Sequence, residues 1–412
     1  MALPLPENLH WPRWFGWSVA LAVLVQLALF ALATGPGLAG TADSGYYVHA
    51  ATTLRTAGRL LHPDGSAYRY WPPLYPVLVS LGGSLAVLRL LHGAAMVVSL
   101  VAWSRLGRWL LPGSLALVFP WLLAFSTPWL VVSKFVWGEA VFLALFAGYA
   151  AALFRWLRQG QRQWWWLATA LGFLLPLQRT AGFFLLAGTA LSLLLARRSL
   201  GWKRLLPVAG HTWLALLGGV VWHVYALLVA APSVYRLNRG WPQFFSSAAD
   251  YGFVVSRWLL PVRAAWRPEL SLLWAPVLAG LLALLWPRAP QPEAVGAGHS
   301  GSELVGPHRF LRVLWIAVLA FVLLLLISTT FTRSAAGLYD AERYASVLFG
   351  PVVLLALQGM GRWFESKPGN RSWSSWLVVG IVSMWLVYSA GRTISNARAL
   401  RKLAPMAWTA AQ

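Results

Sequence analysis

The sequence predicts an all-α membrane protein that crosses the bilayer many times, and three observations lead to this fold class. Hydrophobic residues make up 59% of the 412 residues and charged residues only 11%, whereas soluble domains carry about 25% charged residues. The apolar residues fall into runs of about 17–25 residues, the length that a helix needs to cross a bilayer. Arginines gather in short clusters between these runs, as they do on the cytoplasmic side of membrane proteins. We therefore attribute the net charge of +22 to membrane topology and not to nucleic-acid binding.

About eleven apolar runs are long enough to be membrane spans. The first, Trp14–Thr34, ends near an Ala31-Leu32-Ala33 stretch that imitates a signal-peptide cleavage site. Because many further spans follow, we interpret it as an uncleaved first span. The other expected spans are Ser84–Leu106, Ser114–Val132, Val136–Leu157, Trp164–Leu177, Ala181–Ala196, Leu205–Ala230, Glu269–Trp286, Arg312–Thr330, Tyr344–Trp363 and Trp376–Ala390.

The side of the membrane on which the chain ends is ambiguous. Counting from a cytoplasmic N-terminus, an odd number of spans puts the C-terminus outside. Cations in the tail would favour the cytoplasm instead. These cations are Arg392, Arg398, Arg401 and Lys402. Either one span is miscounted or the tail lies along the outer headgroups, and the sequence leaves both possibilities open.

The rest of the predicted organisation is simple, because residues 1–412 form a single integral membrane domain without internal repeats. Most connections between elements have about 4–6 residues, so three longer segments stand out. Residues 35–83 form a first outer loop with short juxtamembrane helices, and residues 231–268 form a second outer loop. Residues 288–308 are rich in Pro, Gly and Ser, which is typical of a flexible linker, here on the cytoplasmic side.

The eleven acidic residues are distributed unevenly across the predicted membrane. Four lie in expected cytoplasmic segments, namely Glu7, Glu293, Glu303 and Glu365. The other seven lie at the outer face or at the outer ends of spans, namely Asp43, Asp64, Glu139, Asp250, Glu269, Asp340 and Glu342. The same side carries Lys134, Arg179, Arg333 and Arg343. A functional site is therefore predicted on the outer face.

Each candidate residue also has a simpler interpretation. Asp43 could cap a helix, and Glu139, just inside a span, could be neutralised by Lys134 at the interface. An ionisable group at that depth more often faces a cavity. Arg179 and Arg343 could extend to the lipid headgroups.

Several site types are excluded or disfavoured. The chain has no cysteine, which excludes disulfides, thiolate metal sites and cysteine nucleophiles. Its eight histidines show no metal-ligand spacing, and it has neither a P-loop nor a Gly-rich nucleotide-binding fingerprint in a suitable context. Use of a nucleotide sugar at the cytoplasmic face is thereby disfavoured. Asp43 and Glu139 together would suit a hard divalent cation such as Mg²⁺ or Mn²⁺.

Four motifs between Ala42 and Tyr344 resemble those of the GT-C glycosyltransferases, in particular bacterial relatives of the protein O-mannosyltransferases and of the lipid A aminoarabinose transferase. The motifs are Ala42-Asp43-Ser44-Gly45-Tyr46-Tyr47, Tyr70-Trp71-Pro72-Pro73-Leu74-Tyr75-Pro76, Gly138-Glu139-Ala140 and Glu342-Arg343-Tyr344. The resemblance implies a large first outer loop with juxtamembrane helices and a polyprenyl-phosphate sugar donor. It also implies that Asp43 is the catalytic base and Glu139 the second acid of the site. Some relatives carry Asp at the second position and a sizeable C-terminal soluble domain, so metal dependence and the acceptor stay open.

The residue types agree with this chemistry. A lipid phosphate is a good leaving group, so no strong general acid is needed, unlike in glycoside hydrolysis. The reaction needs a base on the acceptor hydroxyl, for which Asp43 is suited, and cations on the departing phosphate. The candidate phosphate ligands are Arg343, Arg179 and Lys134. The candidate substrate-pocket residues are Tyr46, Tyr47, Trp71, Tyr75, Glu342 and Tyr344. Any one of these aromatic residues could instead belong to the aromatic belt that membrane proteins have at the lipid–water interface.

The function predicted from the sequence is inverting transfer of a sugar from a polyprenyl-phosphate donor to a lipid, glycan or protein acceptor. The reaction would take place at the outer face of a bacterial inner membrane. A transporter or flippase of lipid-linked sugars is one alternative, but it would place ionisable groups near the midplane of the membrane. A lipid-linked glycan polymerase or ligase is another, which would rely on outer arginine and histidine pairs without an early Asp. The sequence does not identify the sugar or the acceptor.

Overall fold

The computed structural model describes residues 13–69, 71–195, 202–229, 240–262, 307–331, 338–365 and 371–408. In these ranges the chain is built from helices, and the only β-type pairing consists of two isolated bridges. This agrees with the predicted all-α class. In a membrane, helices satisfy the backbone hydrogen-bonding groups that lipid cannot.

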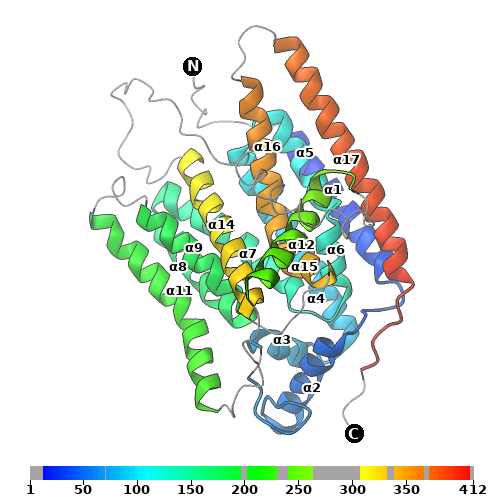
Figure 1. Ribbon diagram of the computed structural model, residues 1–412, viewed down its shortest axis with the longest axis vertical. Coiled ribbons are helices and arrows are strands. Elements are labelled where there is room, and N and C mark those ends of the chain that lie inside the picture. Colours follow the sequence, from blue (N-terminus) through cyan, green and yellow to red (C-terminus); the bar gives the residue numbers. More distant parts are fainter. Residues whose placement is uncertain are drawn as a thin grey trace.

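The long helices form a bundle (Figure 1). They are α1 (Arg13–Ala33), α4 (Leu85–Leu110), α7 (Glu139–Gln159), α8 (Arg162–Gln178), α9 (Gly182–Leu195), α11 (Trp202–Leu228), α14 (Pro307–Phe331), α16 (Phe349–Glu365) and α17 (Arg371–Arg401). Helix α7 packs against α8 on one side and α4 on the other, and α14 packs against α9. Helix α7 is thus in the middle of the bundle, and its first residue is Glu139.

Eight helical segments in the described residues are long and apolar enough to cross a membrane. They are Trp14–Ala33, Leu85–Leu110, Gly113–Lys134, Glu139–Gln159, Leu206–Leu228, Arg309–Ser328, Asp340–Gly361 and Trp376–Arg401. The chain is a multi-pass membrane protein, but the count of eleven spans is not confirmed. Two expected spans form the shorter helices α8 and α9, of 17 and 14 residues, and Glu269–Trp286 lies outside the described residues. The expected linker 288–308 lies almost wholly outside them too, since α14 begins at Pro307.

The third expected span is broken into α5 (Gly113–Ala124) and α6 (Thr127–Lys134). Ser126 starts α6 by accepting a 3.3 Å hydrogen bond from the backbone N–H of Trp129, and Pro128 occupies the first turn. Proline is suited to a first turn because its missing N–H would have no helical partner there. The third expected span is therefore present as the segment Gly113–Lys134, with its helix interrupted at Phe125.

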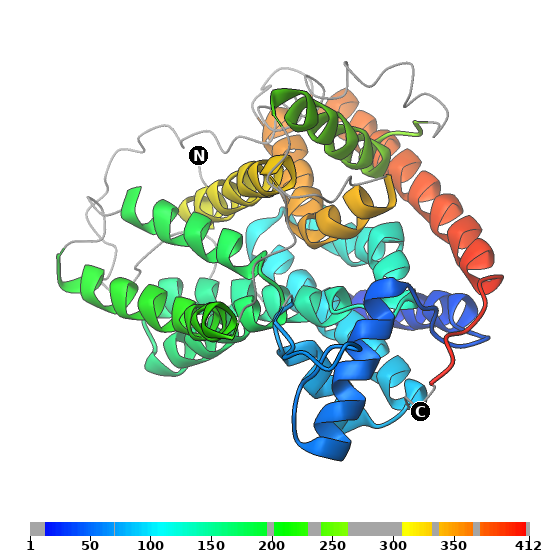
Figure 2. The same cartoon turned by 60° about the horizontal axis from the view of Figure 1, so that its bottom comes forward.

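Two short helices cross one end of the bundle, α2 (Ala42–Ala57) and α3 (Leu74–Gly82). Figure 2 brings this end forward. Both helices end on a glycine in the left-handed conformation, Gly58 with φ 67° and Gly83 with φ 64°. The residue that caps α2 is Thr41, whose backbone N–H bonds the Ser44 hydroxyl at 3.0 Å. Asp43 is inside the first turn, so the alternative that it merely caps the helix is wrong.

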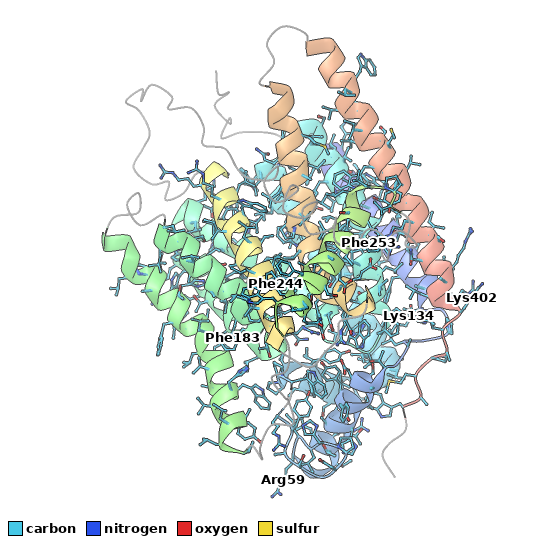
Figure 3. The ribbon with its side chains drawn as sticks, in the orientation of Figure 1. Arg59, Lys134, Phe183, Phe244, Phe253 and Lys402 are labelled. Atoms are coloured by element: carbon cyan, nitrogen blue, oxygen red, sulfur yellow. The ribbon has the colours of Figure 1, made fainter. Side chains whose placement is uncertain are left out.

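The second predicted outer loop contains a helix that the sequence analysis did not predict. Helix α12 (Trp241–Leu259) buries Tyr251, Phe253 and Trp258, and it packs against α15 (Leu338–Ala345). Figure 3 marks Phe244 and Phe253 along α12. Helix α15 leads through a short 3-10 turn, η2 (Ser346–Leu348), into α16. The helical structure of the tenth expected span therefore starts before Tyr344, at Leu338.

The described C-terminal tail lies at the same end of the bundle as α2 (Figure 1). The backbone N–H of Met406 donates a 2.7 Å hydrogen bond to the carbonyl oxygen of Leu38. Leu38 belongs to the connection between α1 and α2. The described part of the tail therefore lies beside the predicted first outer loop, and its side of the membrane stays a prediction.

Candidate active site

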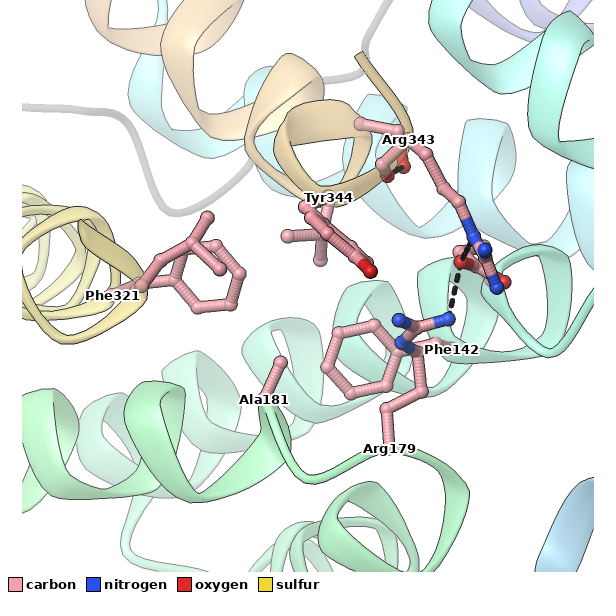
Figure 4. Close-up of a pocket in the computed structure, with 10 residues that line it drawn as sticks. Phe142, Arg179, Ala181, Phe321, Arg343 and Tyr344 are labelled. Atoms are coloured by element: carbon pink, nitrogen blue, oxygen red, sulfur yellow. Dashed lines mark hydrogen bonds and ion pairs between the residues drawn. The ribbon is translucent and has the colours of Figure 1, made fainter. Parts of the chain in front are cut away.

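Four charged side chains meet where α2, α7, α8 and α15 converge. Arg343 donates from Nη1 to Asp43 Oδ2 at 2.7 Å and from Nε to Glu139 Oε1. Arg179 Nη1 forms an ion pair with the same Glu139 oxygen, and Figure 4 shows Arg179 and Arg343 converging at this point of the cavity. Asp43 and Arg343 are 300 positions apart in the sequence. Both predicted acids and both predicted arginines are therefore brought into one cluster.

The ends of α7 and α8 are joined beside this cluster. Glu139 is the first residue of α7, where the helix dipole favours a carboxylate. Arg179 directly follows α8, and its neighbour Gln178 donates from Nε2 to the carbonyl oxygen of Gly138 at 2.7 Å. A Cβ on Gly138 would lie 3.1 Å from that nitrogen. Glycine at this position therefore lets Gln178 fix the start of α7 relative to Arg179.

Trp137 supports the guanidinium of Arg343. The Arg343 Cζ atom lies 4.1 Å from the centroid of the Trp137 ring, a distance at which cation–π attraction is favourable. The indole N–H of Trp137 donates to the Thr41 hydroxyl at 2.8 Å. Since Thr41 caps α2, Trp137 links the helix that carries Asp43 to the arginine that binds it.

The cluster is largely buried. Glu139 is 3% exposed and Arg343 is 5% exposed, whereas the Asp43 side chain is 31% exposed. Buried charges are costly unless they are paired, and both buried groups are paired here. The second carboxylate oxygen of Glu139, Oε2, is buried without a hydrogen-bond partner among the described residues. A buried acceptor without a donor needs an explanation, and a bound ligand would provide one.

A small cavity of about 20 Å³, enough for one water molecule, lies beside Glu139 and the two arginines. Its lining consists of Glu139, Phe142, Arg179, Ala181, Phe321, Leu325, Arg343, Tyr344, Ser346 and Val347. The charged residues lie at one end, and Figure 4 shows Phe321 on the far side of Tyr344 from Arg343. Tyr344 lies next to the charges, with its ring centroid 5.6 Å from Arg179 Cζ. The cavity is thus cationic at one end and apolar at the other.

Lys134 is not part of this cluster. Its side chain is fully buried, and its ammonium donates to the carbonyl oxygens of Ala33 at 3.0 Å and Gly37 at 2.8 Å. Ala33 is the last residue of α1 and Gly37 lies in the connection after it, so the ammonium is at a helix C-terminus, where cations are favourable. The structure therefore gives Lys134 a helix-capping position instead of the predicted one at the phosphate.

Glu342 also lies apart from the cluster, although it is the neighbour of Arg343. Its carboxylate accepts a 2.7 Å hydrogen bond from Arg392 Nη2 of α17. Arg392 Nη1 donates in addition to the carbonyl oxygen of Arg257 at 2.7 Å. Glu342 therefore joins α15 to α17 and α12, and the structure does not bring it to the predicted substrate pocket.

The predicted aromatic residues divide into a buried and an exposed group. Tyr47 and Tyr75 are 4% and 1% exposed and pack edge to face at 5.0 Å. Burial raises the pKa of Tyr47 well above its ordinary value. Tyr46 is 38% exposed, and its ring lies 5.3 Å from that of the half-buried Trp71. Only the second group can contact a ligand without repacking.

Two residues that the sequence analysis missed, Trp137 and Gln178, contribute to the geometry. Each stands within two positions of a predicted charged residue. Proximity in sequence is the only sequence signal for them, because their contacts are with backbone or hydroxyl groups of distant segments.

The residues present do not fit a divalent cation between the two acids. The guanidinium of Arg343 already contacts both Asp43 and Glu139, so an ion at that position would have to displace it. Within the described ranges, no group of three His, Cys, Asp or Glu side chains is arranged to hold a metal.

No protein-family model matches the sequence, and no curated protein matches it. Among solved structures, the chain resembles ArnT from Cupriavidus metallidurans bound to undecaprenyl phosphate, with a TM-score of 0.58 and 16% identity over 94% of this chain and 77% of that one. It also resembles the apo oligosaccharyltransferase of Archaeoglobus fulgidus, with a TM-score of 0.54 and 14% identity over 97% of this chain. The chain spans only 57% of that longer protein.

The chain therefore shares the polytopic helical membrane fold of these two proteins. The predicted fold class, an all-α polytopic membrane protein, is thereby confirmed, apart from the number of spans. A structure of the same oligosaccharyltransferase with Zn and sulfate matches at a TM-score of 0.50 and 15% identity. In the present chain, the guanidinium of Arg343 lies between the carboxylates of Asp43 and Glu139.

Proposed function

We propose that the protein is an inverting glycosyltransferase that takes a sugar from a polyprenyl-phosphate donor and transfers it to an acceptor. The proposed place is the outer face of a bacterial inner membrane, with the site open to the periplasm. The observation that carries the proposal is the pairing of two arginines with two carboxylates, where both arginines line one end of an otherwise apolar cavity. ArnT, which shares the fold, binds undecaprenyl phosphate, and this supports the donor class.

The cavity is the proposed donor side. Arg179 and Arg343 line it, and guanidinium groups bind phosphate oxygens by charge-assisted hydrogen bonds. The apolar walls at Phe142 and Phe321 suit an isoprenoid chain, and the cavity has to widen between them to admit it. As the bond between the anomeric carbon and the phosphate oxygen breaks, negative charge grows on the phosphate, and both arginines stabilise it there. The leaving group is then the polyprenyl phosphate itself.

Asp43 is the proposed base on the acceptor side. Its side chain is the most exposed of the ion-paired groups, so an acceptor hydroxyl can reach it. The hydroxyl oxygen forms the new bond to the anomeric carbon, and its proton passes to the Asp43 carboxylate. A phosphate that engages Arg343 competes with Asp43 for the guanidinium and so frees the carboxylate for this role. A single displacement of this kind inverts the anomeric centre.

Glu139 orients the two arginines, and its free Oε2 is suited to a hydroxyl of the transferred sugar. Tyr344, at the cavity, and the exposed pair Tyr46 and Trp71 are proposed to line the sugar path. Tyr47 and Tyr75 would support that surface from below, since they are buried beneath it.

The test is release of radiolabelled sugar from undecaprenyl-phosphate sugars by the purified protein in lipid nanodiscs. Wild type is expected to release sugar to water or to an acceptor, and Asp43→Asn to lose this activity. Asp64→Asn is the matched control, because Asp64 is an exposed acid of the same loop that bonds only the nearby Ser66 N–H at 2.9 Å. Full activity in a folded Asp43→Asn variant would refute the assignment. Donor movement across vesicles without sugar release would favour a flippase instead.

A further inference from the structure

Helix α15 has two polar faces with different contacts. Asp340, Arg343 and Tyr344 are spaced at i, i+3 and i+4 and therefore share one face of the helix. That face carries Arg343 to Asp43 and Glu139. Glu342 points to the other side, where it meets Arg392. The acid of α15 that shares the face of the site is therefore Asp340.

The charged surroundings of Asp340 are those of the site. Among the described residues, its carboxylate feels the charges of Arg343, Asp43, Glu139 and Arg179. Asp340 is half-buried, and among the described residues its carboxylate has neither a hydrogen-bond partner nor an ion pair. Asp43 and Glu139, in contrast, are both engaged by guanidinium groups.

The charge balance indicates which substrate Asp340 can contact. Three carboxylates share this region with two guanidinium groups, so a donor phosphate would be repelled by the unpaired acid. A carboxylate accepts hydrogen bonds, and hydroxyl groups are suitable donors. The lining of the cavity includes both arginines but neither Asp43 nor Asp340. Neither of these two carboxylates therefore lines the cavity in which a donor phosphate would meet the arginines.

We propose that Asp340 is a specificity-determining residue on the acceptor side of the site. Its carboxylate accepts a hydrogen bond from a second hydroxyl of the acceptor while Asp43 takes the proton of the reacting one. The acceptor is then a polyhydroxylated molecule, a sugar or glycan, and Asp340 favours it over water. This inference rests on the proposed glycosyltransferase function.

The experiment compares Asp340→Asn with Glu342→Gln, an acid two residues away on the opposite side of α15. Three quantities are measured on the full-length protein: undecaprenyl-phosphate binding, hydrolysis of the radiolabelled donor in water, and transfer of label into membranes of the source bacterium, which supply the natural acceptor. Asp340→Asn is expected to keep binding and hydrolysis within about twofold and to lose transfer by about tenfold or more, the order expected for a hydrogen bond to a charged group. Glu342→Gln should keep the wild-type ratio of transfer to hydrolysis, and Asp340→Glu, which retains the charge, should recover part of the transfer.

The outcomes separate the inference from the function on which it rests. Transfer at the wild-type rate in Asp340→Asn would overturn the inference, and so would an equal loss of hydrolysis and transfer. If the ratio of transfer to hydrolysis falls equally in Glu342→Gln, the inference would also be overturned, since the effect would then come from the fold of α15. If the wild type neither binds undecaprenyl phosphate nor releases sugar, the proposed function itself is wrong, and the role of Asp340 with it.

Discussion

Arg343 is the side chain on which the site depends most, because it contacts carboxylates from two separate helices and an indole ring. Lysine could keep the charge but not the planar fork that binds two oxygens at once. We expect Arg343→Lys to lower sugar release about 10²-fold, the order seen when one donor to a developing anion is removed. The measurement is single-turnover release from the radiolabelled donor.

Arg55→Lys is the control, since Arg55 is exposed at the end of α2 and bonds only a backbone carbonyl. A loss of less than about threefold would contradict the role, because removing a donor to a developing anion costs far more than that.

A second prediction at this scale concerns metal ions. Because Arg343 contacts both Asp43 and Glu139, the cationic partner of the phosphate belongs to the protein itself. We expect sugar release to persist after dialysis against EDTA and to rise by less than about twofold on addition of Mg²⁺ or Mn²⁺, which need oxygen ligands that are free. A protein that is inactive after EDTA and restored by either ion would contradict this expectation.

The sequence predicted the members of the charged cluster better than their partners. Charged residues at the outer ends of apolar runs are costly and stand out, and this pattern predicts Asp43, Glu139, Arg179 and Arg343. The pairing of Asp43 with Arg343 spans 300 positions and has no local signature. For Lys134 the prediction was wrong about its contacts, because nothing in the sequence says that the end of α1 returns to α6.

At the scale of elements, Arg392 joins three helices. It bonds Glu342 of α15 and the carbonyl oxygen of Arg257 at the end of α12, and the Tyr388 hydroxyl donates to the same carbonyl at 2.8 Å. Arg392→Gln leaves the buried end of this network short of donors, which costs about 1–3 kcal/mol. Thermal unfolding in detergent measures the loss. Arg398→Gln, at an exposed position of the same helix, should change stability by less than about 0.5 kcal/mol. Equal losses in both variants would contradict the role of Arg392 in joining the three helices.

The first outer loop should respond to acid through His62. This side chain is 2% exposed, and its Nε2 accepts a 3.2 Å hydrogen bond from the backbone N–H of Arg69. Burial lowers the pKa of His62 below its ordinary value, with Asp64 opposing the shift. As the pH falls below about 6.5, the unfolded chain therefore takes up a proton before the folded one does. The stabilisation is complete above that pH and is lost progressively below it.

The corresponding experiment is the difference in melting temperature between pH 7.5 and pH 5.0. His62→Gln keeps a polar acceptor but does not titrate, so we expect a smaller difference than in the wild type. His49→Gln, on α2 of the same loop, should behave as the wild type does. An unchanged difference in the His62 variant would show that other groups cause the acid sensitivity.

The helices of the two predicted outer loops were only partly predictable. The helical period of α2 and the Gly-Gly end of α3 are visible in the sequence, whereas α12 was taken for an outer loop because its residues are less apolar than those of a span. Its helical face is buried by α14 and α15, two helices that follow it in the chain. Tertiary packing of this kind outweighs local preference, and a single sequence does not reveal it.

At the scale of the whole molecule, the fold separates charge across the membrane. Asp43, Glu139 and Asp340 lie at the end of the bundle that carries α2 and α3. Arginines gather at the opposite ends of α4, α7 and α8, namely Arg105, Arg108, Arg155, Arg158 and Arg162. From the positive-inside rule we predict that α2 and α3 lie on the outer side. The described tail lies with them despite its cations, because Met406 is bonded to Leu38.

This arrangement predicts which positions a membrane-impermeant maleimide can reach in intact cells. The chain has no cysteine, so single cysteines can be introduced without background. Arg59→Cys at the tip of the outer loop (Figure 3) and Ala404→Cys in the tail should both be labelled from outside. Gln161→Cys, exposed between α7 and α8, should be labelled only after the membrane is permeabilised. Protection of Ala404→Cys alone would contradict the position of the tail. Labelling of Gln161→Cys with protection of the other two would show that the protein has the opposite orientation in the membrane. The proposed periplasmic site would then face the cytoplasm, whereas the fold would be unaffected.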